Sequence, residues 1–141
     1  MSLKYTRAMN QWLLVALGGA AGSVARYAIA GALNPTPVAH APEPSWGAFP
    51  TGTLAVNLIG CALIGLLAGW LGSASSQPNT HWQPLLATGL LGGFTTFSAF
   101  GMETVHLVRA GLLMPAAAYV LASLTLGITL AAAGYAVTHR V

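Results

Sequence analysis

Four apolar segments dominate this chain and limit what it can fold into. They run approximately over residues 11–33, 53–71, 85–108 and 113–137. Each is close to the roughly 20 residues that a helix needs to cross the hydrocarbon core of a bilayer. Only 5% of the 141 residues are charged, against roughly 25% in soluble domains, so the chain cannot build a water-facing surface. The sequence therefore predicts an all-α, polytopic membrane protein in which residues 1–141 form one transmembrane domain with four helices.

The first apolar segment has two possible interpretations. Lys4 and Arg7 precede it, as basic residues precede the apolar core of a signal peptide. The segment continues from Trp12 to about Leu33 and contains Arg26, which makes it longer and more polar than such a core. We interpret it as a membrane span that is kept.

The basic residues predict an unusual membrane topology. If the N-terminus, the second connection and the C-terminus share one side, that side carries Lys4, Arg7 and Arg140, and the other carries Arg109 and, if its side chain extends to the surface, Arg26. An excess of Lys and Arg in short loops fixes the direction of insertion, and three against two is almost no excess. We therefore expect dual topology, in which oppositely inserted copies form an antiparallel homodimer. The alternative is that Lys4 and Arg7 alone fix one orientation.

Glycines recur at a spacing typical of close helix packing. Three pairs are each four residues apart: Gly18 and Gly22, Gly65 and Gly69, Gly89 and Gly93. This spacing removes side chains from one helix face and lets two backbones approach closely. The pairs favour association of two copies of the chain, and the alternative is packing between helices of one copy.

Polar side chains within the spans are costly, so they mark candidate functional positions. Thr53 and Asn57 are four residues apart and share a helix face, as do Tyr119 and Ser123. These side chains either bond to a neighbouring helix or offer hydrogen-bond donors to an anion. Arg26, the only charge in the first span, either extends to the membrane surface or faces a water-filled vestibule and attracts anions.

Side chains that carry out chemistry are missing from these polar faces. The faces contain no carboxylate, histidine or lysine, so no serine has the adjacent base that a hydrolase requires. The four histidines are scattered without the spacing of metal ligands, and the basic residues are too sparse for a nucleic-acid partner. We predict that the chain is not an enzyme and does not bind nucleic acid.

The third apolar segment contains a stretch unlike an ordinary lipid-facing helix, GLLGGFTTFSAF at residues 89–100. Gly92 and Gly93 each weaken a helix by about 1 kcal/mol, and Thr95 and Thr96 add β-branched side chains. We expect a break in mid-membrane at Gly92 to Thr95. Broken backbone survives there only where protein buries it or it lines a cavity, and its carbonyl oxygens can coordinate cations.

Three stretches together resemble the CrcB or Fluc family of fluoride channels. They are GGAAGSVARY at residues 18–27, PTGTLAVNLIGCALIG at 50–65 and GLLGGFTTFSAFGMET at 89–104. The resemblance covers all four spans. It implies an antiparallel homodimer with two pores in the bilayer of the bacterial inner membrane. Such a channel passively exports cytoplasmic fluoride and so reduces its toxicity.

The resemblance also implies roles for individual residues. A structural sodium ion (Na+) at the dimer centre would be held by the backbone carbonyls of Gly92 and Thr95 from both subunits. The fluoride pathway would include Asn57, Phe97, Phe100, Tyr119 and Ser123, with Thr53 and Arg26 at its vestibule. Glu103 matches a family acid near the pore, without an assigned role.

Two features depart from the family pattern. The loop at residues 34–51 is longer and richer in proline than the family leads us to expect. Gly127 lies one turn beyond Ser123, where some relatives have another hydroxyl, so we expect a shorter polar track.

Two other functions are compatible with four spans. A small drug or cation exporter also uses dual topology, but it couples to protons through a carboxylate in its first span, and this span has none. An interaction subunit of a larger complex would conduct no ions by itself.

Overall fold

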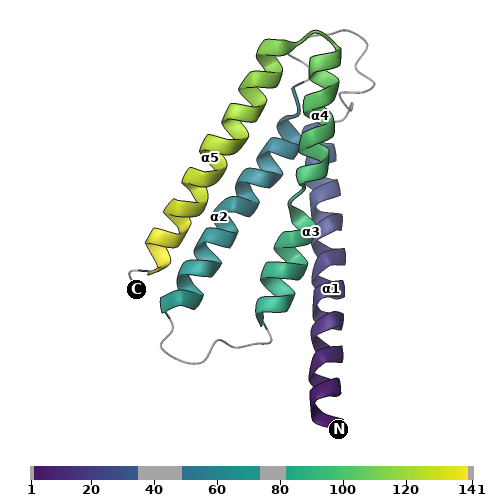
Figure 1. The fold of residues 1–141 in the computed structure, drawn as a ribbon, viewed down its shortest axis with the longest axis vertical. Helices are drawn as coiled ribbons and strands as arrows, with labels where there is room; N and C mark the ends of the chain where they lie inside the picture. The colour runs from purple at the N-terminus through teal and green to yellow at the C-terminus, as the bar shows by residue number, and fades with distance from the viewer. Residues whose placement is uncertain (1, 35–48, 74–81, 140–141) are drawn as a thin grey trace.

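The computed structural model describes residues 2–34, 49–73 and 82–139, which are helical apart from short connections (Figure 1). The elements are α1 (Ser2–Leu33), α2 (Thr51–Ser73), the π-helix η3 (Pro84–Leu91), α3 (Gly92–Phe94), α4 (Phe97–Arg109) and α5 (Leu113–His139). α1 begins and α5 ends at the same end of the molecule. Most of the predicted proline-rich loop, residues 34–51, lies outside the described residues.

Four helical stretches among these residues are long and apolar enough to cross a membrane. They are Asn10–Leu33, Thr51–Gly72, Pro84–Arg109 and Leu113–His139. Each end lies within two residues of the predicted span. The prediction of an all-α, multi-pass membrane protein with four spans is confirmed.

The spans form two helix pairs (Figure 1). α2 runs along α5, and α1 runs along η3 and α3. α1 also touches α2, and α4 lies against α5. The third span therefore divides its contacts, because its first half packs on α1 and its second half packs on α5.

The predicted glycine pairs all lie between helices of this one chain. A Cβ added at Gly93 would lie 3.0 Å from the Cα of Gly19 in α1, and a Cβ at Gly65 would lie 3.0 Å from the Cα of Ala131 in α5. The other members also face backbone atoms of a neighbouring helix: Gly18, Gly22, Gly69 and Gly89. The close approach predicted from the spacing is confirmed. The inference that these faces join two copies is wrong, because a helix of the same chain already covers each of them.

A glycine fixes the turn between α4 and α5. Gly111 has a φ of 77°, in the left-handed region that side chains disfavour. Its amide donates to the carbonyl of Val108 (3.0 Å), and the amide of Leu112 donates to the carbonyl of Leu107 (2.9 Å). These two bonds form a Schellman C-cap. The short connection makes α4 and α5 antiparallel neighbours.

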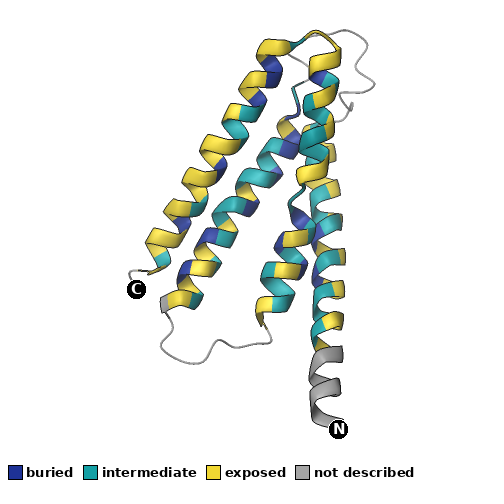
Figure 2. Ribbon diagram, in the orientation of Figure 1, coloured by how far each residue is buried: buried dark blue, intermediate teal, exposed yellow. Residues whose placement is uncertain are grey.

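Few side chains are fully buried, and a cluster of them lies where α4 meets α5 (Figure 2). Leu107 and Tyr119 have no exposed surface, and Ala116 is 4% exposed. Large apolar side chains cover much of the outward surface, among them Trp12, Leu17, Trp70, Leu121 and Ile128. Lipid tails cover such a surface in a bilayer, so a small inner core is sufficient.

The third span is broken, as predicted, but further along the chain than expected. Gly92 is helical, with φ −64° and ψ −37°, and the helix continues to Phe94. The extended residues are Thr95 (φ −85°, ψ 157°) and Thr96 (φ −149°, ψ 117°). The prediction that the break begins at Gly92 is therefore corrected. Gly93 serves close packing on α1, whereas the β-branched threonines, which favour extended backbone, form the break.

Candidate functional site

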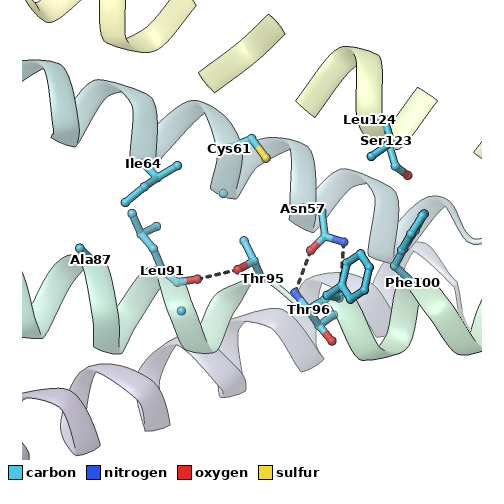
Figure 3. Close-up of a pocket in the computed structure, with 13 residues that line it drawn as sticks. Asn57, Cys61, Ile64, Ala87, Leu91, Thr95, Thr96, Phe100, Ser123 and Leu124 are labelled. Carbon is cyan, nitrogen blue, oxygen red and sulfur yellow. Dashed lines mark hydrogen bonds between the residues drawn. The ribbon is translucent and has the colours of Figure 1, made fainter. Parts of the chain in front are cut away.

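One side chain from α2 stabilises the break at Thr95 and Thr96. The Thr96 amide donates to Asn57 Oδ1 (2.9 Å), and Asn57 Nδ2 donates to the Thr96 carbonyl (3.1 Å) (Figure 3). A buried backbone group without a partner costs about 1–3 kcal/mol, so these two bonds offset the cost of leaving the helix. Asn57 therefore bonds to a neighbouring span, which was one of its two predicted roles. The Asn57 NH2 has two hydrogens, so one remains for another acceptor.

The break leaves two carbonyl oxygens without the amide donors that a continuous helix would give them. In a continuous helix the Thr96 amide would bond to Gly92 O, and the Ala99 amide would bond to Thr95 O. Instead, Thr96 N donates to Asn57, and Ala99 N donates to Thr96 Oγ1 (3.2 Å), which caps α4. Gly92 and Thr95 are the residues whose carbonyls the family resemblance assigns to sodium. Carbonyls of unwound helical turns are suitable sodium ligands, and the described residues contain no cluster of His, Cys, Asp and Glu that could hold a metal.

A cleft of about 380 Å³ lies beside the break, bordered by α2, α5 and the third span (Figure 3). We call it the break cleft. It brings together six of the nine predicted site residues: Asn57, Gly92, Thr95, Phe97, Phe100 and Ser123. The rings of Phe97 and Phe100 have centroids 5.5 Å apart, and Phe97 is 82% exposed. The break cleft thus has an aromatic wall on α4, as the resemblance implied.

Ser123 presents a free hydroxyl at the break cleft. Its Oγ is buried, and it is the only buried side-chain polar atom without a hydrogen-bond partner among the described residues. Because buried hydroxyls are normally paired, an unpaired one at a cleft is available to a ligand. The threonines of α5 differ, since Thr125 Oγ1 donates to Leu121 O and Thr129 Oγ1 donates to Thr125 O, each at 2.7 Å.

Glu103 in α4 joins two of the predicted residues. Thr53 Oγ1 donates to its Oε1 and Tyr119 OH donates to its Oε2, each at 2.7 Å. The hydroxyl hydrogens of Thr53 and Tyr119 are therefore both used in bonds to the carboxylate. Sequence reasoning left Glu103 without a role, although a carboxylate within a span requires donors from its neighbours. That requirement was the signal that could have paired it with Thr53 and Tyr119.

Tyr119 lies behind the aromatic wall and is not among the residues that line the break cleft. Its side chain is fully buried. Its ring packs on Phe100 with a centroid distance of 5.2 Å and on Phe49 with a centroid distance of 5.6 Å. Tyr119 therefore contacts the cleft through Phe100.

A second cleft, of about 870 Å³, includes Thr53 and Arg26, two predicted site residues that do not line the break cleft. We call it the polar cleft. Its polar lining residues are Ser23, Arg26, Tyr27, Asn34, Thr53, Thr96 and Glu103. Thr96 lines both clefts. Thr96 at the break therefore lies between the two clefts.

Arg26 points to the break and not to the membrane surface. Its Nε donates to the carbonyl of Gly93 at 3.1 Å, and Ser23 Oγ lies 3.5 Å from the same oxygen. The interpretation as an arginine that extends to the surface does not fit this bond. The second interpretation, a vestibule residue, agrees with the place of Arg26 in the polar cleft.

The two clefts offer donors for a small anion. The break cleft provides the Ser123 hydroxyl, the second N–H of Asn57 and the positive ring edges of two phenylalanines, and none of the described residues that line it is charged. The polar cleft adds the guanidinium of Arg26. Binding or passage of an anion is therefore the chemistry that this arrangement supports.

Comparison with known proteins agrees with this geometry. The family described as "CrcB-like protein, Camphor Resistance (CrcB)" matches residues 13–135. A protein from Methylobacillus flagellatus named "Fluoride-specific ion channel FluC" is 46% identical over 127 residues, which cover 90% of this chain and 93% of the relative. Proteins with the same name from Paracoccus denitrificans and a Caulobacter species are 45% and 40% identical, over 91% and 94% of this chain and 94% and 98% of the relatives. The chain therefore belongs to the CrcB-like family.

Proposed function

We infer that this chain is a passive, fluoride-selective anion channel of a bacterial membrane that lets cytoplasmic fluoride leave the cell. The observation that carries this function is the unpaired, buried Ser123 hydroxyl at the break cleft. Relatives that are 40–46% identical over most of the chain are named fluoride-specific ion channels. The exporter alternative finds no support in these relatives.

The chemistry of the break cleft matches the needs of fluoride. Fluoride is small and strongly hydrated, so a pore must replace its water with donors that are already in place. The Ser123 hydroxyl, the second Asn57 N–H and the ring edges of Phe97 and Phe100 can do so. In the part of the chain that the structure describes, no lysine or arginine lines this cleft, and conduction requires that an ion can leave as well as enter. We assign no catalytic step to these residues.

The polar cleft is the proposed vestibule. Among the described residues, Arg26 is its only cationic side chain, and it attracts an anion toward Thr96, which lines both clefts. Thr53 and Tyr119 donate to Glu103, so we assign them a supporting role in which they keep the carboxylate fully hydrogen-bonded. Fluoride then passes from the side of Arg26 to the donors of the break cleft.

We also propose that two copies form an antiparallel homodimer. The residues of one copy enclose the break cleft only in part, and Phe97, which lines it, is 82% exposed. Because Arg26 turns to the break, the count of basic residues is three against one, and it does not by itself favour both orientations. The antiparallel arrangement therefore rests on the resemblance to the family. A second copy would complete the wall beside Phe97.

Sodium is the proposed structural cofactor of the dimer. The carbonyls of Gly92 and Thr95, whose helical partners are diverted to other acceptors, would hold it. The ion would supply positive charge near an anion pathway that has few charged side chains. No step of fluoride passage is assigned to it.

Anion efflux from liposomes that contain only this protein tests the function. Vesicles loaded with potassium fluoride and given a potassium ionophore should release fluoride rapidly, and chloride-loaded vesicles should release almost none. Absence of fluoride release, or equally fast chloride release, would contradict the channel. An exporter would instead require a proton gradient, and an interaction subunit would release neither ion.

A further inference from the structure

Asn34 ties the end of α1 to the start of α2. It directly follows α1, and its amide still donates to the carbonyl of Ala30 (2.9 Å). Its side chain bonds to residues that follow it by 15 positions or more. Nδ2 donates to the carbonyl of Phe49 (3.1 Å), and Oδ1 accepts from Thr51 Oγ1 (3.0 Å) and from the Gly52 amide. One amide group therefore bonds to three of the four residues 49–52 around the start of α2.

The two ends of the Asn34 side chain do different work. Its Oδ1 accepts from the second amide of α2, which is the bond that an N-cap residue usually provides. Pro50, which precedes α2, has no polar side chain for this role. The Nδ2 of Asn34 instead holds Phe49, which lies just outside the helix. The oxygen therefore caps α2, and the nitrogen orients Phe49.

The joint between the two helices is closely packed. A Cβ added at Gly52 would lie 2.8 Å from Asn34 Oδ1 and 2.9 Å from the Cα of Ala30. Pro50 is fully buried beside it. The end of α1 and the start of α2 are thus in direct contact, and Asn34 cannot move far without displacing Phe49.

Phe49 connects this joint to the aromatic wall. Its ring meets the ring of Tyr119 edge to face, with centroids 5.6 Å apart and an interplanar angle of 79°. Tyr119 in turn packs on Phe100 at 5.2 Å, and Phe100 lines the break cleft. The contacts therefore run without a gap from Asn34 through Phe49 and Tyr119 to the wall.

We propose that Asn34 is a positioning residue for the anion pathway, because its Nδ2 holds Phe49 against Tyr119 and so supports Phe100. The proposal rests on the proposed channel function. Loss of the Nδ2 bond frees Phe49, and Tyr119 and Phe100 lose the support behind them. Fluoride passage slows while the helices remain assembled.

Fluoride efflux from liposomes that contain the full chain tests this role. Asn34→Ala should slow efflux by about three- to tenfold, the factor that one lost neutral hydrogen bond produces in an equilibrium. Thr51→Val is the matched control, because it removes a bond to Asn34 Oδ1 and leaves the Nδ2 bond to Phe49; its efflux should equal that of the unmodified chain. Unchanged efflux in Asn34→Ala would overturn the proposal.

A double-mutant cycle separates positioning from general destabilisation. Phe49→Leu should slow efflux, and adding Asn34→Ala to it should slow efflux no further, because the two residues act in one chain of contacts. If the two slowing factors multiply, Asn34 does not act through Phe49 and the proposal fails.

Asn34→Asp tests the same point in a variant that keeps the cap. Its carboxylate still accepts from Thr51 and Gly52 but cannot donate to Phe49. Measured in high salt, which screens the added charge, its efflux should be as slow as that of Asn34→Ala. Efflux equal to that of the unmodified chain would overturn the proposal, even if Asn34→Ala does not fold. If the unmodified chain releases no fluoride, the channel function itself fails, so the two failures are distinguishable.

Discussion

The two halves of the third span are held in place by different physical means. η3 and α3 pack on α1 through glycines, so that backbone meets backbone at Gly93 and Gly19. α4 is held by polar side chains, since Thr96 caps its first turn and Glu103 accepts two hydroxyls. Close backbone contact is therefore the main feature of the first half, whereas the second half combines the apolar cluster around Leu107 with hydrogen bonds to Glu103. Substitutions in the two halves should therefore impair stability and fluoride efflux to different degrees.

The largest effect on stability is expected in the first half of the span, where backbone packs directly on backbone. Gly93→Val should prevent α3 from packing on α1, because its Cβ would lie 3.0 Å from the Cα of Gly19. Backbone atoms cannot rotate aside as a side chain can. Overpacking of this kind costs about 1–3 kcal/mol or more. The yield and melting temperature of detergent-purified protein measure it. Gly101→Val is the control, because Gly101 in α4 has open space around it; equal behaviour of the two variants would contradict the packing argument.

The next largest effect is expected at Asn57, whose bonds to Thr96 stabilise the break between the two halves. Asn57→Ala leaves both backbone groups of Thr96 without their partner, so stability should fall by about 1–3 kcal/mol. Fluoride efflux should fall by about 5- to 150-fold, the factor to which that free-energy range corresponds. Thr125→Ala is the control, since Thr125 bonds only to its own helix. A variant that retains both full efflux and the original melting temperature would show that Asn57 does not stabilise the break.

A smaller effect on fluoride efflux is expected at Glu103. Tyr119→Phe keeps the aromatic packing and removes one donor at 2.7 Å from the carboxylate. A hydrogen bond to a charged group contributes about 1.5–3 kcal/mol, so the melting temperature should fall, with a smaller loss of efflux than in Asn57→Ala. Tyr135→Phe, in the last turns of α5, serves as the comparison. If it destabilises as much as Tyr119→Phe, the bond to Glu103 has no special importance.

The smallest effect on stability is expected at Ser123. Its Oγ has no hydrogen-bond partner, so Ser123→Ala should change the free energy of unfolding by less than about 0.5 kcal/mol. Fluoride efflux should nevertheless fall, because a donor of the break cleft is lost. Thr129→Ala, which removes a hydroxyl already bonded to Thr125, should leave efflux unchanged. Normal efflux in Ser123→Ala would remove Ser123 from the pathway.

The sequence predicted the spans well because their length and low charge leave a helix little choice in a bilayer. It also predicted a break in the third span, but it placed the break at the glycines. Gly92 and Gly93 are poor helix formers in isolation, yet Gly93 permits contact with α1 and stays helical. The bond from Asn57, which decides that Thr96 leaves the helix, comes from a residue 39 positions away. Local propensity contains no information about such a partner.

The candidate site was predicted in part for a similar reason. Spacing along one helix grouped Thr53 with Asn57 and Tyr119 with Ser123, but the structure divides each pair between different surroundings. Asn57 and Ser123 line the break cleft, whereas Thr53 and Tyr119 donate to Glu103. Which residue of a helix face meets a cleft depends on the neighbouring helix, and spacing within one helix does not specify it.

The break also has an electrostatic consequence. It creates two helix ends in the middle of the membrane, where a continuous span would have none. Helix dipoles place partial negative charge at the C-terminal end of α3 and partial positive charge at the N-terminal end of α4. Arg26 bonds to the first end at the Gly93 carbonyl, and Thr96 and Phe97 bring the second end to the break cleft. The N-terminal end of α4 thus adds partial positive charge to a cleft in which no described residue contributes an ionised side chain.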